Sequence, residues 1–379
     1  MKPADRIVAA LEGRKTDRIP TLSLLADPNI ANQVTGRKPF PVLSFLKSPV
    51  GSRLLDRQAA RINRLADLGV FGVNDLGARI NFEMGFDAFM PCYWRFQVRN
   101  SREAQDVFGR AWNIVDDGHG NPYLMYNRGL LKTPEQWRQW PLPEVASYAT
   151  RAARMYRVLR YRWGEKIALV PLVGPGIWEN AWQPIGFPEW VVLLRRDPGF
   201  AREVIRYYTT LTVAMVESYC HAGAPAICYG DDLAYKSGPM LSPKQLAELL
   251  GDACRQITAT AHRLGRPIFI HSCGNSTQLL PLFQEWGFDG AHAFEPTAGN
   301  DLAAARSQVG SRFCLVGNID VSHILTEAER GEVEQAVSEA IRKASGGGFI
   351  LAPAHSHGDI RVRNVLWMLE AALRRGATG

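Results

Sequence analysis

A histidine and a cysteine stand two residues apart at the end of an apolar run, in the stretch RPIFIHSCGN at residues 266–275. In a β-strand, residues i and i+2 point to the same face, so His271 and Cys273 would present an imidazole and a thiol side by side. Zinc prefers these two donors in proteins. The spacing therefore predicts half of a metal site; the alternative is two polar side chains at a strand end.

Further ligands have to come from another strand, because catalytic zinc usually takes three protein ligands. The later run ILAPAHSH contains His355 and His357. We predict His355 as the third ligand because it lies closer to the body of the strand, where backbone hydrogen bonds hold the geometry tightly. His357 precedes a glycine and an aspartate, so we place it in a turn, where it orients the substrate or donates a proton.

Other polar and aromatic residues near strand ends are candidates for the same site. Glu295 is predicted as a fourth ligand or a general acid/base, against the alternative of a loop carboxylate paired with an arginine. Asp232 is predicted to orient the substrate or to hydrogen-bond a metal-bound histidine. Trp178 and Trp182 are predicted to wall a cofactor or a flat substrate, or else to pack onto the rim. Asn318 is assigned to the cofactor-binding surface, with turn formation as its alternative.

The elements that must position these residues are apolar runs separated by helical patterns. The runs lie at residues 168–174, 226–232, 267–274, 290–295, 313–320 and 348–357. This alternation predicts βαβ units with parallel strands. Most of the runs end in polar residues, which is typical of the catalytic face of a (β/α)8 TIM barrel. No G-x-G-x-x-G follows a first strand, so we favour the barrel over an open dinucleotide-binding sheet.

The first half of the chain is less regular. Residues 62–76 predict a helix that leads into a strand ending near Asp75, a weaker candidate for the site. Residues from about 90 to 130 are aromatic and rich in turn formers, which predicts a β-hairpin insertion. We expect a single barrel domain over residues 1–379.

Composition excludes some classes of protein. Of 379 residues, 46% are hydrophobic, so the chain can build a core. The net charge of +7 permits an anionic partner, but no basic arm indicates nucleic acid. The arginines spaced by three from Arg151 to Arg160 predict a solvated helix face, with docking of an acidic partner as the alternative. The six cysteines form no C-x-x-C motif, and we find no secretory signal and no membrane-spanning run, which together predict a cytoplasmic protein. Whether the protein forms a homodimer is left open.

Several stretches together resemble the uroporphyrinogen decarboxylase superfamily. They are PADRIVAALEGRKTDRIP, DDLAYKSGPMLSPKQLAELL, IFIHSCGN, GFDGAHAFEPTAGNDLAAA, FCLVGNID and ILAPAHS. The resemblance implies a (β/α)8 barrel. True decarboxylases carry an arginine-rich R-Q-A-G-R-Y signature that grips the carboxylates of the porphyrinogen, whereas residues 19–36 of this chain contain no arginine. That departure argues against porphyrinogen decarboxylation.

The H-x-C motif resembles the zinc-dependent methyltransferase branch of this superfamily, which works with corrinoids. Where those relatives have a third cysteine after L-A-P-G, this chain has His355 after LAPA. A Cys-His-His zinc is less negative and more electrophilic, which favours cleavage of a methyl ether and transfer of the methyl group to a corrinoid. The stretch DDGHGNP lacks the glycine of the D-x-H-x-x-G corrinoid motif, so cobalamin would arrive free or on a partner corrinoid protein.

Three alternatives stay open at this point. One is a zinc-dependent thiol methyl- or alkyltransferase that needs no corrinoid. Another is a decarboxylase or lyase without metal on the same fold. The last is a binding protein without catalytic activity that uses the mouth of the barrel for a ligand. Tightly bound zinc would separate the first of these from the other two.

Overall fold

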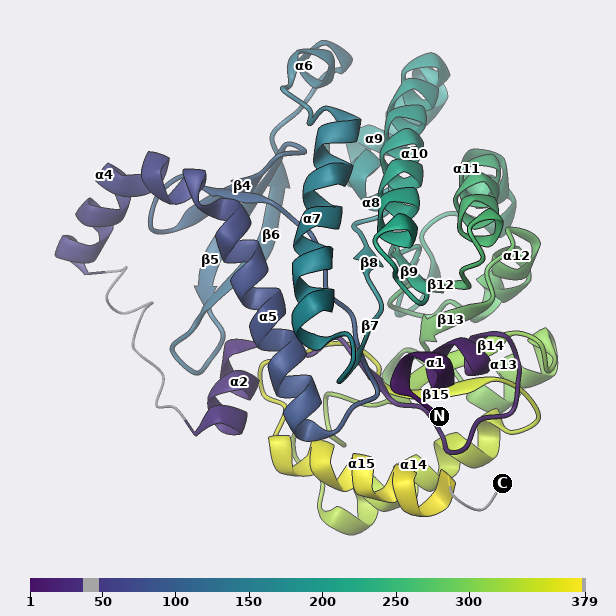
Figure 1. The fold of residues 1–379 in the computed structure, drawn as a ribbon. Helices are drawn as coiled ribbons and strands as arrows, with labels where there is room; N and C mark the ends of the chain where they lie inside the picture. The colour runs from purple at the N-terminus through teal and green to yellow at the C-terminus, as the bar shows by residue number, and fades with distance from the viewer. Residues whose placement is uncertain (37–47, 377–379) are drawn as a thin grey trace.

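The computed structural model describes residues 1–36 and 48–376 (Figure 1). The N-terminal amphipathic pattern forms a helix, and further helices alternate with strands along the second half of the chain. The helices are α1 (Pro3–Leu11), α2 (Pro28–Thr35), α4 (Pro49–Arg64), α5 (Ala66–Met84), α6 (Pro134–Gln139), α7 (Val145–Trp163), α8 (Ile177–Trp182), α9 (Phe187–Arg196), α10 (Pro198–His221), α11 (Pro243–Arg263), α12 (Leu280–Glu285), α13 (Leu302–Val309), α14 (Arg330–Ala344) and α15 (Val362–Gly376), with 3-10 turns at Thr277–Leu279 and Pro296–Ala298.

Parallel strands form two sheets, which confirms the α/β class and each of the six predicted strand runs. One sheet has the order β1-β2-β7 and the other the order β15-β14-β13-β12-β9-β8. Isolated parallel bridges connect the two sheets: Thr21, directly before β1, pairs with Leu351 of β15, and Cys92, after β2, pairs with Leu172 of β8. Within both sheets, neighbouring strands follow one another in chain order. They are β1 (Leu22–Ser23), β2 (Ala88–Phe89), β7 (Ala168–Leu169), β8 (Leu172–Val173), β9 (Ile227–Gly230), β12 (Ile268–His271), β13 (Gly290–Ala293), β14 (Cys314–Ile319) and β15 (Phe349–Pro353).

The two faces of these strands enter two separate cores. Alternate residues such as Ile268 and Ile270 belong to the larger core, whereas Phe269 belongs to a smaller core on the other face of the strands, which we call the inner core. Helix α1 contributes Ile7 and Leu11 to this inner core. Because side chains alternate along a strand, His271 shares the face of Phe269. The polar end of β12 therefore continues the inner core.

The segment predicted to be a hairpin insertion forms a four-stranded antiparallel sheet instead, with the order β3-β4-β5-β6. Its strands are β3 (Phe96–Val98), β4 (Glu103–Asp106), β5 (Arg110–Asp116) and β6 (Pro122–Gly129). The extra strands follow from side-chain turns: the Asn100 Oδ1 accepts from the amides of Arg102 and Glu103, and the Asp106 Oδ1 accepts from the amides of Phe108 and Arg110. Each turn reverses the chain once. A separate antiparallel pair follows β9; it consists of β10 (Ala234–Tyr235) and β11 (Gly238–Pro239).

The predicted strand near Asp75 is wrong, because residues 66–84 form the single helix α5. Asp75 forms an ion pair with Arg162 and accepts a hydrogen bond from the indole of Trp163, both at the end of α7.

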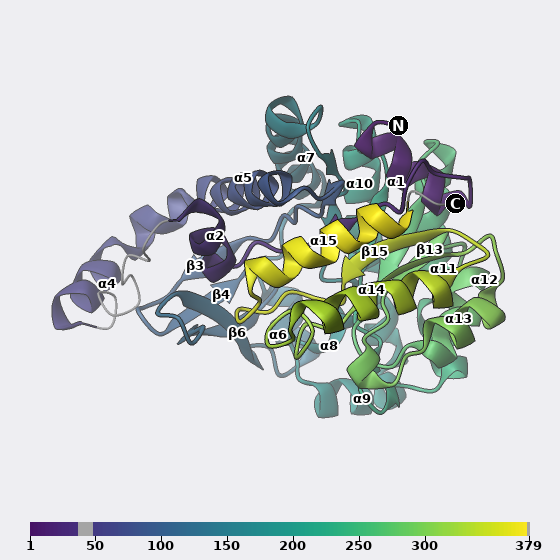
Figure 2. The same cartoon turned by 90° about the horizontal axis from the view of Figure 1, so that it is seen from below.

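The arginines of α7 from Arg151 to Arg160 are exposed, as predicted for a solvated face. Figure 2 shows α14 and α15 side by side. Within the described part of the chain, no helix has the length and apolar character needed to cross a bilayer.

Candidate metal centre

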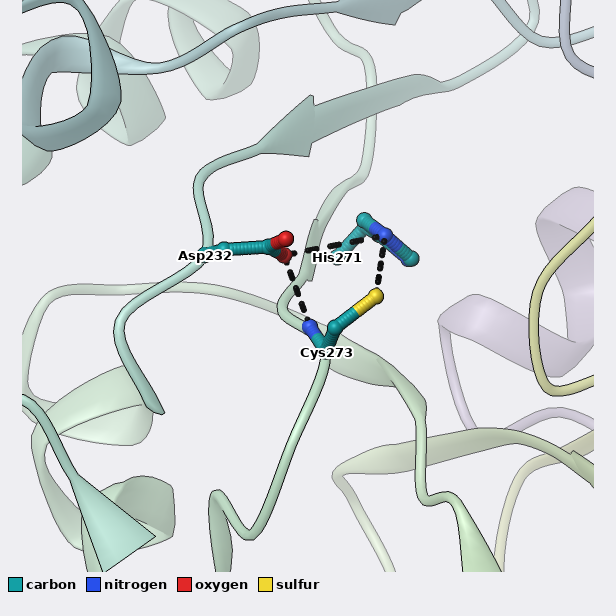
Figure 3. A group of neighbouring side chains, drawn as sticks. All are labelled: Asp232, His271 and Cys273. Carbon is teal, nitrogen blue, oxygen red and sulfur yellow. Dashed lines mark hydrogen bonds and ion pairs between the residues drawn. The ribbon is translucent and has the colours of Figure 1, made fainter. Parts of the chain in front are cut away.

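The candidate site lies where β9 and β12 end. In the parallel register of these strands, His271 pairs with Gly230 and on its other side with His292 of β13. Asp232 follows β9 by two residues, and Cys273 follows β12 by two residues. Figure 3 shows the side chains of Asp232, His271 and Cys273 turned toward one another. Among the described residues, this is the one group of three whose potential ligand atoms lie close together, all within 4.8 Å.

The distances in this group are those of side chains in contact. The Cys273 Sγ lies 3.5 Å from the His271 Nε2, and the His271 Nε2 lies 3.9 Å from the Asp232 Oδ1. The backbone amide of Cys273 donates to the Asp232 Oδ1 at 2.8 Å, which ties the two strand ends together. The same-face prediction for His271 and Cys273 therefore agrees with the structure.

A second histidine, His292, decides which nitrogen of His271 faces this group. The His292 Nε2 lies 3.1 Å from the backbone oxygen of Pro353, which can only accept, so we assign the proton of a neutral His292 to Nε2. The His292 Nδ1 then accepts, and the His271 Nδ1, 2.6 Å away, donates to it. The His271 Nε2 is left with a lone pair directed at Asp232 and Cys273. A fixed tautomer of this kind is typical of metal-binding histidines.

Burial sets the charges of these groups. Burial lowers the pKa of His271. Burial and the neighbouring His271 together lower the pKa of His292 well below its usual range. Both rings are therefore neutral near pH 7. Burial, followed by the charges of Asp232 and Glu295, raises the pKa of the Cys273 thiol well above its ordinary value. Without a cation, the site holds a protonated thiol beside an imidazole lone pair.

The donor set fits a zinc ion. An imidazole lone pair and a carboxylate oxygen lie 3.9 Å apart, and both accept hydrogen bonds, so neither satisfies the other. The thiol can offer its one proton to the His271 Nε2. A divalent cation bound by nitrogen, sulfur and carboxylate oxygen would satisfy all three groups and would favour the thiolate.

Further carboxylates surround the group. The Glu295 Oε1 accepts from the amide of Gly274 at 3.0 Å, which places this buried residue beside Cys273. Burial raises the pKa of Asp231 to about 7, although Tyr229 and two amides of α8 donate to this carboxyl. Burial and the charges of Asp232 and Asp231 raise the pKa of Glu179 well above its usual value. The oxygen Oε2 of Glu179 accepts from the amide of Asp232 at 3.3 Å.

The two predicted histidines of the later run lie in the loop after β15. The Nδ1 of His355 donates to the backbone oxygen of Ser356 at 2.7 Å, which leaves its Nε2 with a lone pair. His355 is close enough to help lower the pKa of His271, yet it is outside the group of three. The amide of Asp359 donates to the Nδ1 of His357 at 3.2 Å, in the turn that was predicted. The structure thus offers Asp232 as a third donor, and the ligand role of His355 stays a prediction.

The predicted cofactor-binding residues are spread around the rim. Trp182 is partly exposed and packs edge-on against Phe187 at 5.7 Å between ring centroids. Trp178 has no exposed surface, and its indole nitrogen lies 3.3 Å from the sulfur of Met240. Asn318 is half-buried near the end of β14. The cofactor-binding roles of Trp178, Trp182 and Asn318 stay predictions.

Sequence reasoning missed His292 and Glu179 as functional candidates. His292 stands on the strand that follows the H-x-C strand, and its signal was a polar residue inside the run GAHAFE. Asp231 belongs to the same predicted strand end as Asp232. Glu179 is a single carboxylate among aromatic residues in IWENAW, where only the structure reveals its contact with the end of β9.

Comparison with known proteins agrees with this architecture. The family model described as uroporphyrinogen decarboxylase (URO-D) matches residues 115–374. The chain belongs to the uroporphyrinogen decarboxylase family. A uroporphyrinogen decarboxylase of Coxiella burnetii is 27% identical over 184 residues, 47% of this chain and 48% of that protein, so the chain spans about half the length of the curated relatives it matches.

Two solved structures share the fold of this family member. A methyltransferase from Methanosarcina mazei superposes with a TM-score of 0.68 at 16% identity, covering 98% of each chain. A B12-independent methionine synthase from Shewanella sp. W3-18-1 superposes with a TM-score of 0.53 at 12% identity, covering 95% of this chain and 97% of the other. At these identities the likeness concerns the fold alone.

Proposed function

We propose that this protein is a zinc-dependent methyltransferase that moves a methyl group between a small methylated substrate and a corrinoid. The observation that carries the proposal is the His271 Nε2 lone pair facing a carboxylate at 3.9 Å and a thiol at 3.5 Å. Zinc bound there would supply a Lewis acid that polarises an oxygen of the substrate or holds a thiolate. The fold shared with the Methanosarcina mazei methyltransferase is compatible with this chemistry.

The chain's own residues would hold and orient the reactants. His271 and Cys273 hold the metal, Asp232 is the third donor that lies with them, and His355 is the competing third donor. Glu295, beside Cys273, is proposed as the general acid/base. His357, whose side chain is 41% exposed, is placed to orient substrate or donate a proton at the surface.

The strand order supports a (β/α)8 barrel in this proposal. Parallel strands that run from β1 to β15 and return to β1 through the Thr21–Leu351 bridge have the connectivity of that fold. The proposed ligands lie at or just after strand carboxyl ends, where barrel enzymes keep their active sites. A corrinoid would approach this mouth, with Trp182 and Asn318 as its proposed contacts, either free or on a corrinoid protein.

Asp232 also strengthens a second candidate function. A Cys-His-Asp set carries as much negative charge as a Cys-Cys-His set. Zinc bound by it would therefore be less electrophilic than zinc bound by Cys-His-His, and the argument for cleavage of an ether would lose its basis. A more negative zinc suits a bound thiolate. The second candidate is therefore alkyl transfer to a thiol without a corrinoid.

The test is to incubate the zinc-loaded protein with a methylated aromatic ether and cob(I)alamin, and to follow the absorbance of methylcobalamin. We expect methylcobalamin to form with wild type and not with Cys273→Ser. Methylation of an added thiol without cobalamin would select the second candidate. Conversion of uroporphyrinogen to coproporphyrinogen would overturn both.

A further inference from the structure

The inserted antiparallel sheet carries a buried ion pair that points toward the metal site. Arg110 and Asp106 have no exposed side-chain surface and form a salt bridge within the sheet. The guanidinium also lies 4.9 Å from the ring centroid of Trp94. A buried charge pair is costly to desolvate, so it stabilises a fold weakly, and breaking it is strongly unfavourable. Such a pair suggests a role besides stability.

From this pair, hydrogen bonds leave the sheet in one direction. The Nη1 of Arg110 donates to the Gln183 Oε1 at 2.8 Å, and the Gln183 Nε2 donates to the Glu179 Oε1 at 2.9 Å. Arginine can only donate, so the amide oxygen of Gln183 must face Arg110 and its NH2 must face Glu179. The insertion thereby fixes the orientation of Gln183 and, through it, one oxygen of Glu179.

The other oxygen of Glu179 reaches the metal site. Its Oε2 accepts from the amide of Asp232 at 3.3 Å, and the Asp232 Oδ1 accepts from the amide of Cys273 at 2.8 Å. In return, the Asp231 Oδ1 accepts from the amide of Glu179 at 3.0 Å. The start of α8 and the end of β9 therefore hold each other in place, and the series of contacts that begins at Arg110 ends at the proposed ligands.

We propose that Arg110 is a positioning residue for the metal centre, and that it fixes the Asp232 carboxylate through Gln183 and Glu179. This inference rests on the proposed function, since it concerns the same zinc ion. The inserted sheet would then be part of the active site although none of its residues is a proposed ligand. Its contribution is the orientation of a ligand rather than contact with the reactants.

The experiment uses Gln183→Met, which keeps the volume but cannot relay hydrogen bonds, and Arg110→Lys. The control is Arg6→Lys, because Arg6 is likewise buried and paired with a buried carboxylate, Asp87, but lies in α1 at the amino ends of the strands. Zinc affinity is measured by chelator competition, the ligand field by the visible spectrum of the Co²⁺-substituted protein, and stability by thermal unfolding of the metal-free protein.

We expect Gln183→Met and Arg110→Lys to lower zinc affinity roughly 10–100-fold and to change the Co²⁺ spectrum, as partners of metal ligands do. Arg6→Lys should lower the unfolding temperature and leave affinity and spectrum unchanged. If wild type binds zinc and both variants bind it equally with the same spectrum, this inference fails while the proposed function stands. A wild-type protein that binds no zinc would overturn both.

Discussion

Asp232, His271 and Cys273 lie at the ends of β9 and β12, whereas His355 and His357 lie in the loop that follows β15. On the strand side, His271 is 14% exposed and hydrogen-bonds His292, and Asp232 accepts from the amide of Cys273. On the loop side, His357 is 41% exposed and His355 turns to the backbone of its neighbour. The Asp232 side chain is itself 40% exposed, so the contrast lies in the hydrogen bonds: groups tied to one another keep the narrow geometry that a metal requires, and the strand side is the better place for ligands.

The loop side is held by contacts of another kind. The Asn29 Nδ2 donates to the oxygen of Gly358 at 2.7 Å, and the Ser356 hydroxyl donates to Asp27. The inserted sheet reaches this loop through an exposed contact of 2.8 Å between His119 and Asp359. Exposed pairs contribute little stability. The pair of His119 and Asp359 therefore adds little to the hold on this loop.

The largest effect that would test this contrast is the loss of the third donor. We expect Asp232→Asn to lower zinc affinity by more than about 100-fold, beyond the roughly 10–100-fold of a supporting residue, and His355→Ala to lower it less. The measurement is chelator competition at constant pH. The reverse order would return the third position to His355, as the family resemblance implies, and would move a ligand to the loop side.

The next effect concerns the tautomer of His271. In His292→Phe, the His271 Nδ1 loses its acceptor, so Nε2 no longer keeps its lone pair directed at the metal. We expect zinc affinity to fall roughly 10–100-fold. His262→Phe is the control, because the exposed side chain of His262 pairs with the half-buried Asp289 at the amino end of β12, away from the site. Equal affinities in the two variants would show that His292 does not set the tautomer.

A pH effect follows from the shifted pKa values. The raised pKa of Cys273 means that its thiol is protonated at neutral pH before metal binds, whereas the lowered pKa of His271 means that this ring is already neutral. Each zinc ion should therefore displace about one proton near pH 7.5, and affinity should rise about tenfold per pH unit. Calorimetry in buffers of different ionisation enthalpy measures the proton count. A count near zero would mean that Cys273 is not bound as a thiolate.

The smallest effects belong to the loop. His357→Ala should keep the metal and lose rate at most. His119→Ala removes the exposed contact with Asp359 and should change the free energy of unfolding by less than about 1 kcal/mol, with zinc affinity unchanged. Metal analysis and chemical denaturation test both variants. Loss of zinc in His357→Ala would shift the ligand register by two residues along the loop.

Much of the fold could be predicted because buried parallel strands are nearly continuous apolar runs. The strands from β7–β8 to β15 stand out in this way, whereas β1 and β2 have two residues each and leave no pattern. Residues 70–73 are apolar and partly β-branched, so they resemble a strand, but they belong to the helix α5, which packs against α2 and α7. Tertiary packing therefore makes residues 70–73 helical.

The proximity of His271 and Cys273 was predictable because they stand two residues apart, at the end of β12 and just beyond it. His271 and Cys273 follow from strand parity alone. His292 and Glu179 act through register between strands and through contact between α8 and β9, which no local pattern contains. The hydrogen bonds that lead from Arg110 to Glu179 depend on where the whole antiparallel sheet lies, which no local sequence pattern contains.

The most direct test of the account is the zinc content of the purified chain beside Cys273→Ser and His271→Ala. The account predicts one zinc per wild-type chain, bound through dialysis against a weak chelator, and loss of that zinc in both variants while they stay folded by circular dichroism. Full zinc content in Cys273→Ser, or a wild-type chain that takes up no zinc, would contradict it.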